Sequence, residues 1–266
     1  MHNHTTVISK KEKRIYAIFF LVLVILWVFS TIYTKFSFFE LFANCGTCWD
    51  FLSKDFFPPS LPGQGRLLHV VQSVLITIAM AVTATVCAGV CAFFVSLFAS
   101  EYISPIPRLA KYIRGIATFM RNIPALVWAF ILFSSLGIGT SVGFAALFIT
   151  SFAFLIRAFV ETMDEVSDDC VESLLSVGAS FPQRVVHGIL PSCIPGFISW
   201  FLYCFEVNIR ASTIVGMVGG GGVGLVLLSY LKSFKYHTAS GIILLVAVMI
   251  ILVDLLTGKL RRELEK

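Results

Sequence analysis

One short polar stretch, EVNIRAST at residues 206–213, holds the side chains of this sequence that are best suited to chemistry. Glu206 and Arg210 are spaced i,i+4, the order that favours an ion pair along one face of a helix. The planar guanidinium of Arg210 also matches the donor geometry that an oxyanion requires. Neutral donors lie nearby: Asn208, Ser212 and Thr213. In lipid such a pair would be costly, so the stretch is a candidate substrate pathway through the bundle interior, with the alternative that Glu206 and Arg210 only lock helices together.

A second informative stretch, VESLLSVGASFPQRVVHGILP, occupies residues 171–191. Its apolar residues have helical spacing, which predicts a short amphipathic helix, a hinge at Gly178 and a second helix stopped by Pro191. A plain connection between two membrane helices needs only a few residues. The length and periodicity favour a surface on which a partner docks, and the alternative is a helix that rests on lipid headgroups.

The elements that position these residues are expected to be membrane helices. The 266-residue chain is 58% hydrophobic and 13% charged, which is more apolar than a soluble domain of this size can bury. Long apolar runs predict an all-α integral membrane protein. The first run is longer than the apolar core of a signal peptide, and no small-residue cleavage site follows it, so it is expected to be a retained helix.

Six apolar runs are expected to cross the membrane, because a helix needs about 20 residues to cross about 30 Å of hydrocarbon. They are residues 15–33, 70–99, 116–136, 143–160, 194–218 and 239–256. The third run is apolar only over 124–136 and must reach back toward Ile116 to cross. The predicted organisation has three parts: a basic tail at 1–14, a transmembrane domain at 15–258 with a loop at 161–191, and a second basic tail at 259–266.

The distribution of Lys and Arg predicts the topology, since these residues concentrate on the cytoplasmic side. Each tail carries four of them, so both termini are expected in the cytoplasm, which requires an even number of spans. Residues 161–190 break the pattern, because Arg184 is their only Lys or Arg against six carboxylates. Parity still places this segment inside, since acidic residues carry little weight in the rule.

Further expectations concern the fifth span. Asn208 is two residues from Arg210, so it is expected on another face, against a neighbouring helix. Counted from Ser192, Arg210 lies about 27 Å along a helix, in the outer half of the membrane. The glycines at 219–222 are expected to end the helix in a packed turn at the outer mouth. The alternative for these glycines is a flexible surface loop.

Residues 171–191 resemble the EAA loop of ABC-importer permeases, whose pattern is E-A-A, three residues, Gly, nine residues and I-x-L-P. Glu172, Gly178, Leu190 and Pro191 fall on this pattern. Three positions depart from it: Ser173, Leu174 and Gly188. In that family the loop is the coupling helix, which inserts into a groove of the ATPase subunit.

Other stretches are similar to the permease subunit of phosphonate importers, in collinear order from about residue 50 to residue 258. They are DFFPP at 55–59, RNIPALVWA at 121–129, GIG at 137–139, GILPSCIP at 188–195 and FEVNIRASTIVGMVGGGGVG at 205–224. The resemblance implies a type I importer fold with six transmembrane helices and a cytoplasmic coupling helix. The implied cargo is phosphonate or a related phosphorus oxyanion. Permeases for phosphite, hypophosphite and methionine carry kindred segments, so the exact ligand stays open.

The resemblance also implies partners in the bacterial inner membrane. They are two copies of an ABC ATPase, a periplasmic or lipid-anchored solute-binding protein, a second copy of this chain and membrane lipid, with no nucleic acid. Closure of the ATPases on ATP would rock the two permease subunits between inward-open and outward-open states.

Enzymatic chemistry is not expected of this chain. The sequence has no P-loop, no HExxH and no Ser/His/Asp arrangement. We therefore expect no catalytic residue, no cofactor and no metal site, with ATP hydrolysis on a separate subunit. A channel or scaffold without an ATPase is the other class considered, and a membrane enzyme the third.

Four other side chains carry weaker expectations. Arg121 and Arg157 are expected to reach the cytoplasmic interface with their long side chains, and Arg157 to pair with Glu161. Cys45 and Cys48 form a CxxC pair that could be a disulfide in an oxidising compartment. The pair offers too few ligands for zinc.

Overall fold

The computed structural model describes residues 10–101, 103–104, 106–176 and 178–264. The chain divides into two compact units, Met1–Asp55 and Phe56–Lys266. Every element among the described residues is a helix, which confirms the all-α prediction.

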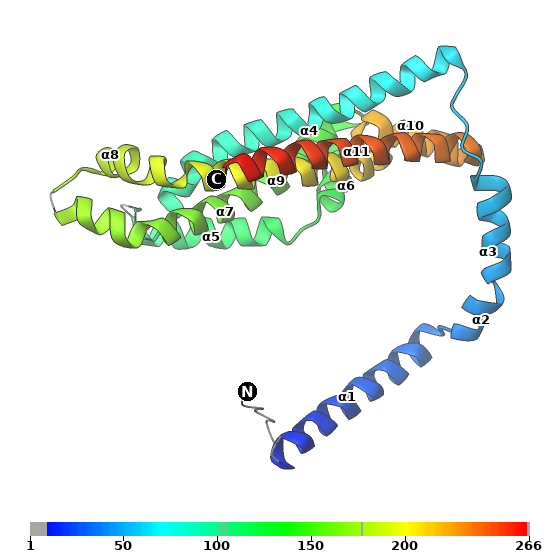
Figure 1. The fold of residues 1–266 in the computed structure, drawn as a ribbon, viewed down its shortest axis with the longest axis horizontal. Coiled ribbons are helices and arrows are strands. Elements are labelled where there is room, and N and C mark those ends of the chain that lie inside the picture. The colour runs from blue at the N-terminus through cyan, green and yellow to red at the C-terminus, as the bar shows by residue number, and fades with distance from the viewer. Residues whose placement is uncertain (1–9, 102, 105, 177, 265–266) are drawn as a thin grey trace, which may run out of the picture. The chain divides into compact units, whose positions relative to one another are not determined.

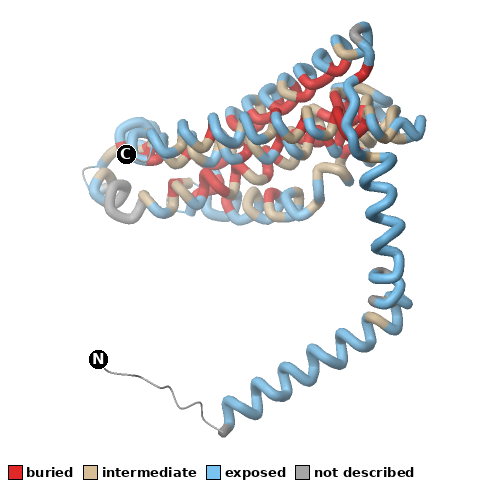
Figure 2. The backbone as a smooth tube through the Cα atoms, turned by 45° about the vertical axis from the view of Figure 1, so that its right-hand side comes forward, coloured by how far each residue is buried: buried red, intermediate tan, exposed pale blue. Residues whose placement is uncertain are grey.

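The first unit is dominated by α1, Lys10–Thr34, whose described side chains are almost all exposed (Figure 2). Residues Lys11–Thr34 are long and apolar enough to cross a membrane. An apolar helix that is exposed all round is compatible with lipid rather than water. Three short helical segments follow: α2 (Phe38–Ala43), α3 (Cys45–Phe51) and a π-helical turn, Leu52–Phe56. Cys45 and Cys48 lie exposed on α3 as free thiols.

The second unit is built on four long helices that run along its length (Figure 1). They are α4 (Gln64–Ala99), α7 (Thr140–Ser176), α9 (Leu190–Val215) and α11 (Tyr236–Leu264). The shorter elements are α5 (Pro107–Arg121), α6 (Ala125–Leu136), α8 (Phe181–Arg184), α10 (Gly222–Lys232) and two π-helical turns, Val185–Ile189 and Gly216–Gly220. We call the two ends of this unit the α8 end, where α11 finishes, and the α10 end, where α4 begins (Figure 1).

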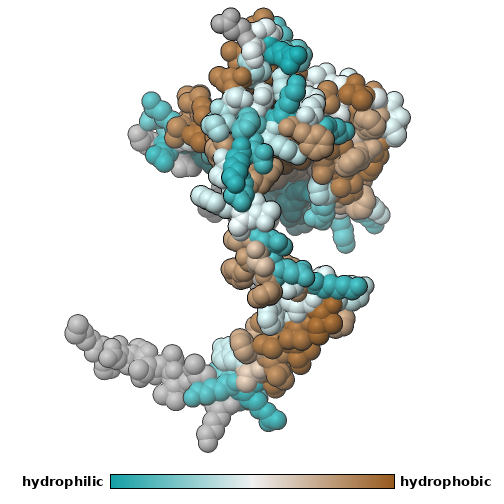
Figure 3. All heavy atoms as spheres, turned by 90° about the vertical axis from the view of Figure 1, so that its right-hand side faces the viewer, coloured by the Kyte–Doolittle hydropathy of each residue, from teal (hydrophilic) through white to brown (hydrophobic). Residues whose placement is uncertain are grey.

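Small residues let the long helices approach one another closely. Four alanines recur at helical spacing along α4 and are all buried: Ala81, Ala84, Ala88 and Ala92. They lie in the clusters that α4 forms with α7 and α9. In lipid, helices associate through such close packing, since apolar burial alone gives no driving force. Many large hydrophobic side chains remain exposed on the sides of the bundle, where Figure 3 shows brown patches.

The third predicted span, residues 116–136, is not a single straight helix. The structure has α5 and α6 instead, which meet at a bend of 88°. Pro124 lies in this break, and a proline restricts the residue before it and removes a backbone donor. The described residues contain five helices that are long and apolar enough to cross a membrane, or up to six if the bent pair is one span.

The boundaries predicted around the 161–191 loop are also wrong. The fourth helix does not end near residue 160 but continues to Ser176, so most of the expected loop is helix. Pro191 does not stop a helix, because it lies in the first turn of α9. The π-helical turn Val185–Ile189 directly precedes it, and the helical run continues through this proline. The helical run that contains α9 extends over Phe181–Gly220, 40 residues in all.

The glycine run ends this helical segment in a packed turn, as predicted, and the alternative of a flexible surface loop is wrong. Gly219, Gly221 and Gly222 have φ angles of 109°, 78° and 65°, which favour glycine. The Gly219 carbonyl accepts from the Gly139 amide at 2.8 Å, and the Val223 amide donates to the Thr77 hydroxyl at 2.8 Å. The turn is therefore fixed by α4 and by the start of α7.

Gly216→Ala is expected to destabilise this turn. A Cβ there would lie 2.5 Å from the Gly221 carbonyl oxygen and 3.0 Å from the Gly224 Cα, both backbone atoms that cannot move aside. Such overpacking costs about 1–3 kcal/mol or more. The melting temperature of the purified chain should fall, while Gly115→Ala, where no atom lies within 4 Å, should leave it unchanged. Equal melting temperatures for the two variants would show that this turn is not tightly packed.

Candidate functional site

The residues that match the EAA pattern lie at the α8 end, where the chain reverses between α7 and α8. Gly178 has a φ of 77°, and the Ala179 amide donates to the Leu174 carbonyl at 3.0 Å, a bond typical of a helix that ends in a left-handed residue. Ser180 then begins α8 with a capping box that uses Gln183. The predicted positive φ at the hinge is thus confirmed.

The remaining residues of the EAA pattern flank this reversal. Glu172 is on α7, and its side chain lies outside the described residues. Leu190 is half-buried and Pro191 is exposed at the start of α9. The structure therefore places all four pattern residues close to the ends of the two helices that the loop joins.

A half-buried polar network, missed in the sequence, ties α7 to its neighbours at the same end. Asp164 on α7 accepts from Arg114 of α5 at 2.7 Å and from the Ser100 hydroxyl at 2.6 Å. Arg114 also donates to the Ala99 carbonyl at 2.6 Å and lies 3.3 Å from Glu101. Arg114 and Asp164 lie 50 residues apart in the sequence, so only the fold brings them together.

Glu206 and Arg210 form the predicted ion pair, and two residues of α11 join it. Arg261 lies 3.6 Å from the second Glu206 oxygen, and Arg210 lies 4.0 Å from Asp254. Glu206 is the most buried member, with 16% of its side chain exposed against 45% for Arg210. Two acids and two bases thus neutralise one another between α9 and α11.

The predicted depth of Arg210 in the membrane was counted from Ser192, and this starting point is wrong. The helical run begins at Phe181 rather than near Ser192. Arg210 instead lies beside Asp254, in the part of α11 that approaches the α8 end (Figure 1).

Asn208 faces the neighbouring helices, as predicted. Its amide nitrogen donates to Thr85 of α4 at 2.8 Å and to Ser151 of α7 at 2.6 Å. The other two polar residues of the stretch do not join this group. Ser212 donates to the Ile209 carbonyl of its own helix, and the Thr213 hydroxyl is buried with no hydrogen-bond partner among the described residues.

A cavity of about 220 Å³ opens beside Asn208. Its walls come from α5, α7 and α9: Arg121, Thr150, Ser151, Phe154, Tyr203, Cys204, Val207 and Asn208. Arg121 is the last residue of α5, at the bend before Pro124, and makes no hydrogen bond or ion pair with any other residue that the structure describes. Ser151, which accepts from the Asn208 amide at 2.6 Å, supplies a hydroxyl group to the same wall.

The sequence analysis did not place Arg121 in a polar cavity but expected it to extend toward the cytoplasmic interface. It lines this cavity with Ser151, which lies within the apolar run of α7. The available signal was the RNIP stretch, because an Arg before a Pro-induced break can be turned into the bundle. Arg157 does pair with Glu161, at 2.9 Å. Among the described residues, no group of three or more His, Cys, Asp or Glu could hold a metal ion.

Comparison with known proteins identifies relatives of this chain. Residues 92–266 match the family model of the binding-protein-dependent transport system inner membrane component. The phosphite transport system permease protein PtxC of Stutzerimonas stutzeri is 30% identical over 80% of this chain and 76% of its own length. The phosphate-import permease protein PhnE of Mycolicibacterium smegmatis is 29% identical over 81% of this chain, which spans 41% of that longer protein.

Solved structures agree on the fold. The permease in an inward-facing structure of the MetNI methionine ABC transporter has a TM-score of 0.68, with 19% identity, over 76% of this chain and 99% of that one. At this identity the likeness establishes the fold, that of the type I ABC-importer permeases. The chain therefore belongs to the family of binding-protein-dependent transport system inner membrane components and is the permease subunit of an ABC importer, with ATP hydrolysis on a separate subunit.

Proposed function

We propose that this permease carries a phosphorus oxyanion, phosphonate or phosphite, across the bacterial inner membrane. The observation that carries the proposal is the cavity at Arg121. A guanidinium without a counter-ion faces hydroxyl and amide groups there, which is an arrangement suited to a small oxyanion rather than to a zwitterion. The names of the phosphite and phosphate-import permeases among the relatives favour the same class of cargo.

The polar residues of α9 divide into two roles in this proposal. Asn208 lines the pathway beside Arg121, and Thr213, whose hydroxyl is unpaired, is a second neutral donor further along α9, beyond Ser212. Glu206 and Arg210 hold α9 against α11 together with Asp254 and Arg261. Arg210 is already neutralised, so it is less suited than Arg121 to bind a passing anion.

Charge removal at the α9–α11 contact separates the two roles. Glu206→Gln and Arg210→Gln are each expected to lower the stability of the chain by about 1–3 kcal/mol, because each leaves a charge without its partner. The double variant should recover both assembly and uptake, since Asp254 and Arg261 remain as opposite charges. Thermal melting and substrate uptake are measured side by side. An assembled double variant that takes up no substrate would instead put Arg210 on the pathway.

The α8 end is the proposed contact with the ATPases. Glu172, Gly178, Leu190 and Pro191 mark it by their match to the EAA pattern, and the Arg114–Asp164 network anchors the helix that carries it. Two ATPase subunits, a solute-binding protein on the opposite side and a second copy of this chain complete the proposed assembly. If the chain were a channel or scaffold without an ATPase, the turn between α7 and α8 would have no ATPase to contact.

The proposed topology places both termini and the α8 end in the cytoplasm. Single cysteines at Asp50 and Lys235 should react with an impermeant thiol reagent added to intact cells that lack the native cysteines. Cysteines at Ser180 and Leu264 should not. All four positions are exposed, so a lack of reaction would report sidedness rather than burial. Labelling at Ser180 from outside would overturn both the topology and the ATPase contact.

The cargo is tested by ATPase stimulation. The chain, its ATPase and its binding protein are purified together and assayed with methylphosphonate, phosphite or methionine. The two phosphorus oxyanions should stimulate ATP hydrolysis, while methionine should not. Stimulation by methionine alone would replace the proposed cargo with that of the methionine-type permeases.

A further inference from the structure

The α10 end of the second unit carries positive charge and no carboxylate. The sequence stretches 56–100, 122–160 and 207–253, which supply this end, contain no Asp or Glu. Two of their five Lys and Arg residues, Arg157 and Arg210, are paired with carboxylates elsewhere in the unit. The cations left at the α10 end are Arg66, Lys232 and Lys235. A surface with one sign of charge concentrates ions of the opposite sign.

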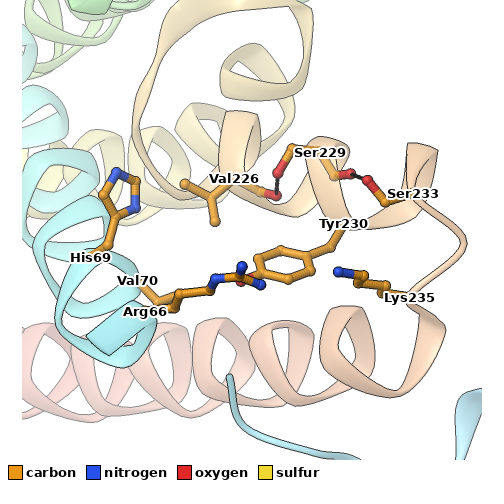
Figure 4. A pocket seen from close by; sticks show the side chains of 8 residues that line it. All are labelled: Arg66, His69, Val70, Val226, Ser229, Tyr230, Ser233 and Lys235. Carbon is orange, nitrogen blue, oxygen red and sulfur yellow. Dashed lines mark hydrogen bonds between the residues drawn. The ribbon is translucent and has the colours of Figure 1, made fainter. Parts of the chain in front are cut away.

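Two of these cations line a single cavity of about 330 Å³. Arg66 and His69 come from the first turns of α4, Tyr230 from α10, and Lys235 from the turn before α11. Figure 4 shows the Arg66 and Lys235 side chains extending toward one another beside the Tyr230 ring. Neither cation makes an ion pair with any other residue that the structure describes, and the cavity has no acidic side chain in its wall.

The hydroxyl groups of the wall have distinct roles. Ser229 donates to the Val226 carbonyl at 2.7 Å and Ser233 to the Ser229 carbonyl at 2.8 Å, so these two shape the wall (Figure 4). The described residues supply no hydrogen-bond partner for the Tyr230 hydroxyl or the His69 ring. The cavity thus presents the planar donor fork of Arg66, the ammonium of Lys235, the Tyr230 hydroxyl and the His69 ring.

We propose that this cavity binds a phosphate-type oxyanion, held by Arg66 and Lys235 with Tyr230 and His69 as further donors. A guanidinium fork binds two oxygens of such a group, and an ammonium binds a third as a point charge. The oxyanion comes either from free phosphate or phosphonate in solution or from the headgroup of an anionic lipid. The inference goes beyond the proposed function, because binding here requires neither ATP nor passage through the Arg121 cavity.

The first test measures a free anion. Radiolabelled inorganic phosphate is dialysed to equilibrium against the full chain in dodecyl maltoside, in an Arg121→Gln background so that the other cavity does not contribute. The double variant Arg66→Gln/Lys235→Gln should bind phosphate at least about tenfold more weakly, the effect of losing charge-assisted hydrogen bonds. The matched control is Lys232→Gln, which removes an exposed cation of the same end that does not line the cavity.

The second test measures a lipid. Native mass spectrometry of the same three proteins with added phosphatidylglycerol should show retained lipid that the double variant loses and Lys232→Gln keeps. Selective loss of either phosphate or lipid supports the site and identifies its source. The proposal is overturned if the double variant and Lys232→Gln behave alike toward both. It is also overturned if the double variant loses only the binding of the purified solute-binding protein, because the cations would then form a protein contact.

Discussion

Arg121→Gln is expected to abolish uptake of phosphorus oxyanions while the transporter remains assembled. Among the described residues that line the cavity formed by α5, α7 and α9, Arg121 is the only cation, so the substitution removes the charge-assisted bonds to the anion. Each such bond contributes about 1.5–3 kcal/mol, which corresponds to a loss of about ten- to a hundredfold in uptake. No described side chain depends on Arg121 for an ion pair, so the fold should be unaffected.

Two further variants sharpen this prediction. Arg121→Lys keeps the charge but loses the planar fork, and should retain part of the uptake. Arg108→Gln removes an exposed cation from the same helix and should change uptake by no more than about twofold. The measurement is the uptake of labelled methylphosphonate by vesicles that contain the whole transporter. Equal uptake by Arg121→Gln and Arg108→Gln would remove Arg121 from the pathway.

Gly178→Val should uncouple the permease from its ATPase. Gly178 has a φ of 77°, and no atom lies within 4 Å of a Cβ placed there, so the cost comes from the backbone alone. A β-branched residue in that conformation is strained by about 1–3 kcal/mol, which would open the reversal between α7 and α8. Two quantities are expected to fall about tenfold: the amount of ATPase that co-purifies with the permease, and the rate of ATP-driven uptake.

The nature of the defect is established by comparison with two substitutions. Gly178→Asn should keep most of the coupling, because Asn tolerates left-handed backbone. Gly115→Val places the same side chain in open space without a positive φ, and should affect neither ATPase recovery nor uptake strongly. If Gly178→Val recovers as much ATPase as Gly115→Val, the proposed docking surface is wrong.

Local chemistry explains which parts of the fold could be predicted from the sequence. The apolar runs identify the membrane helices because a spanning helix must bury its backbone groups internally and needs about 20 apolar residues. The turn at 219–222 was predictable because glycine alone adopts positive φ there at little cost. The i,i+4 spacing of Glu206 and Arg210 predicted their pair, which depends on one helix only.

The errors arise where tertiary packing decides. Charged residues after 160 suggested that the fourth helix had left the membrane, but they do not end a helix, and α7 continues to Ser176. Pro191 was read as a stop, although Pro is equally compatible with a first turn. Asp254 and Arg261 join Glu206 and Arg210 only through the packing of α11 on α9, for which their sequence positions carry no signal.

The candidate pathway shows the same limit. Asn208 was predictable as a residue that faces neighbouring helices, but its partners Thr85 and Ser151 were not. Arg121 enters the cavity because the chain bends by 88° directly after it. A bend of that kind follows from Pro124 in general terms, while its direction depends on the helices against which α5 and α6 pack.

ATP-driven uptake into proteoliposomes tests the central claim most directly. The chain is reconstituted with its ATPase, and the binding protein is added outside the vesicles. Accumulation of labelled methylphosphonate and phosphite is then followed with and without ATP in the vesicle lumen. The account predicts accumulation that requires ATP, the ATPase and the binding protein together, and that disappears in Arg121→Gln. Accumulation that proceeds without the ATPase, or that is restricted to a cargo without a phosphorus oxyanion, would contradict it.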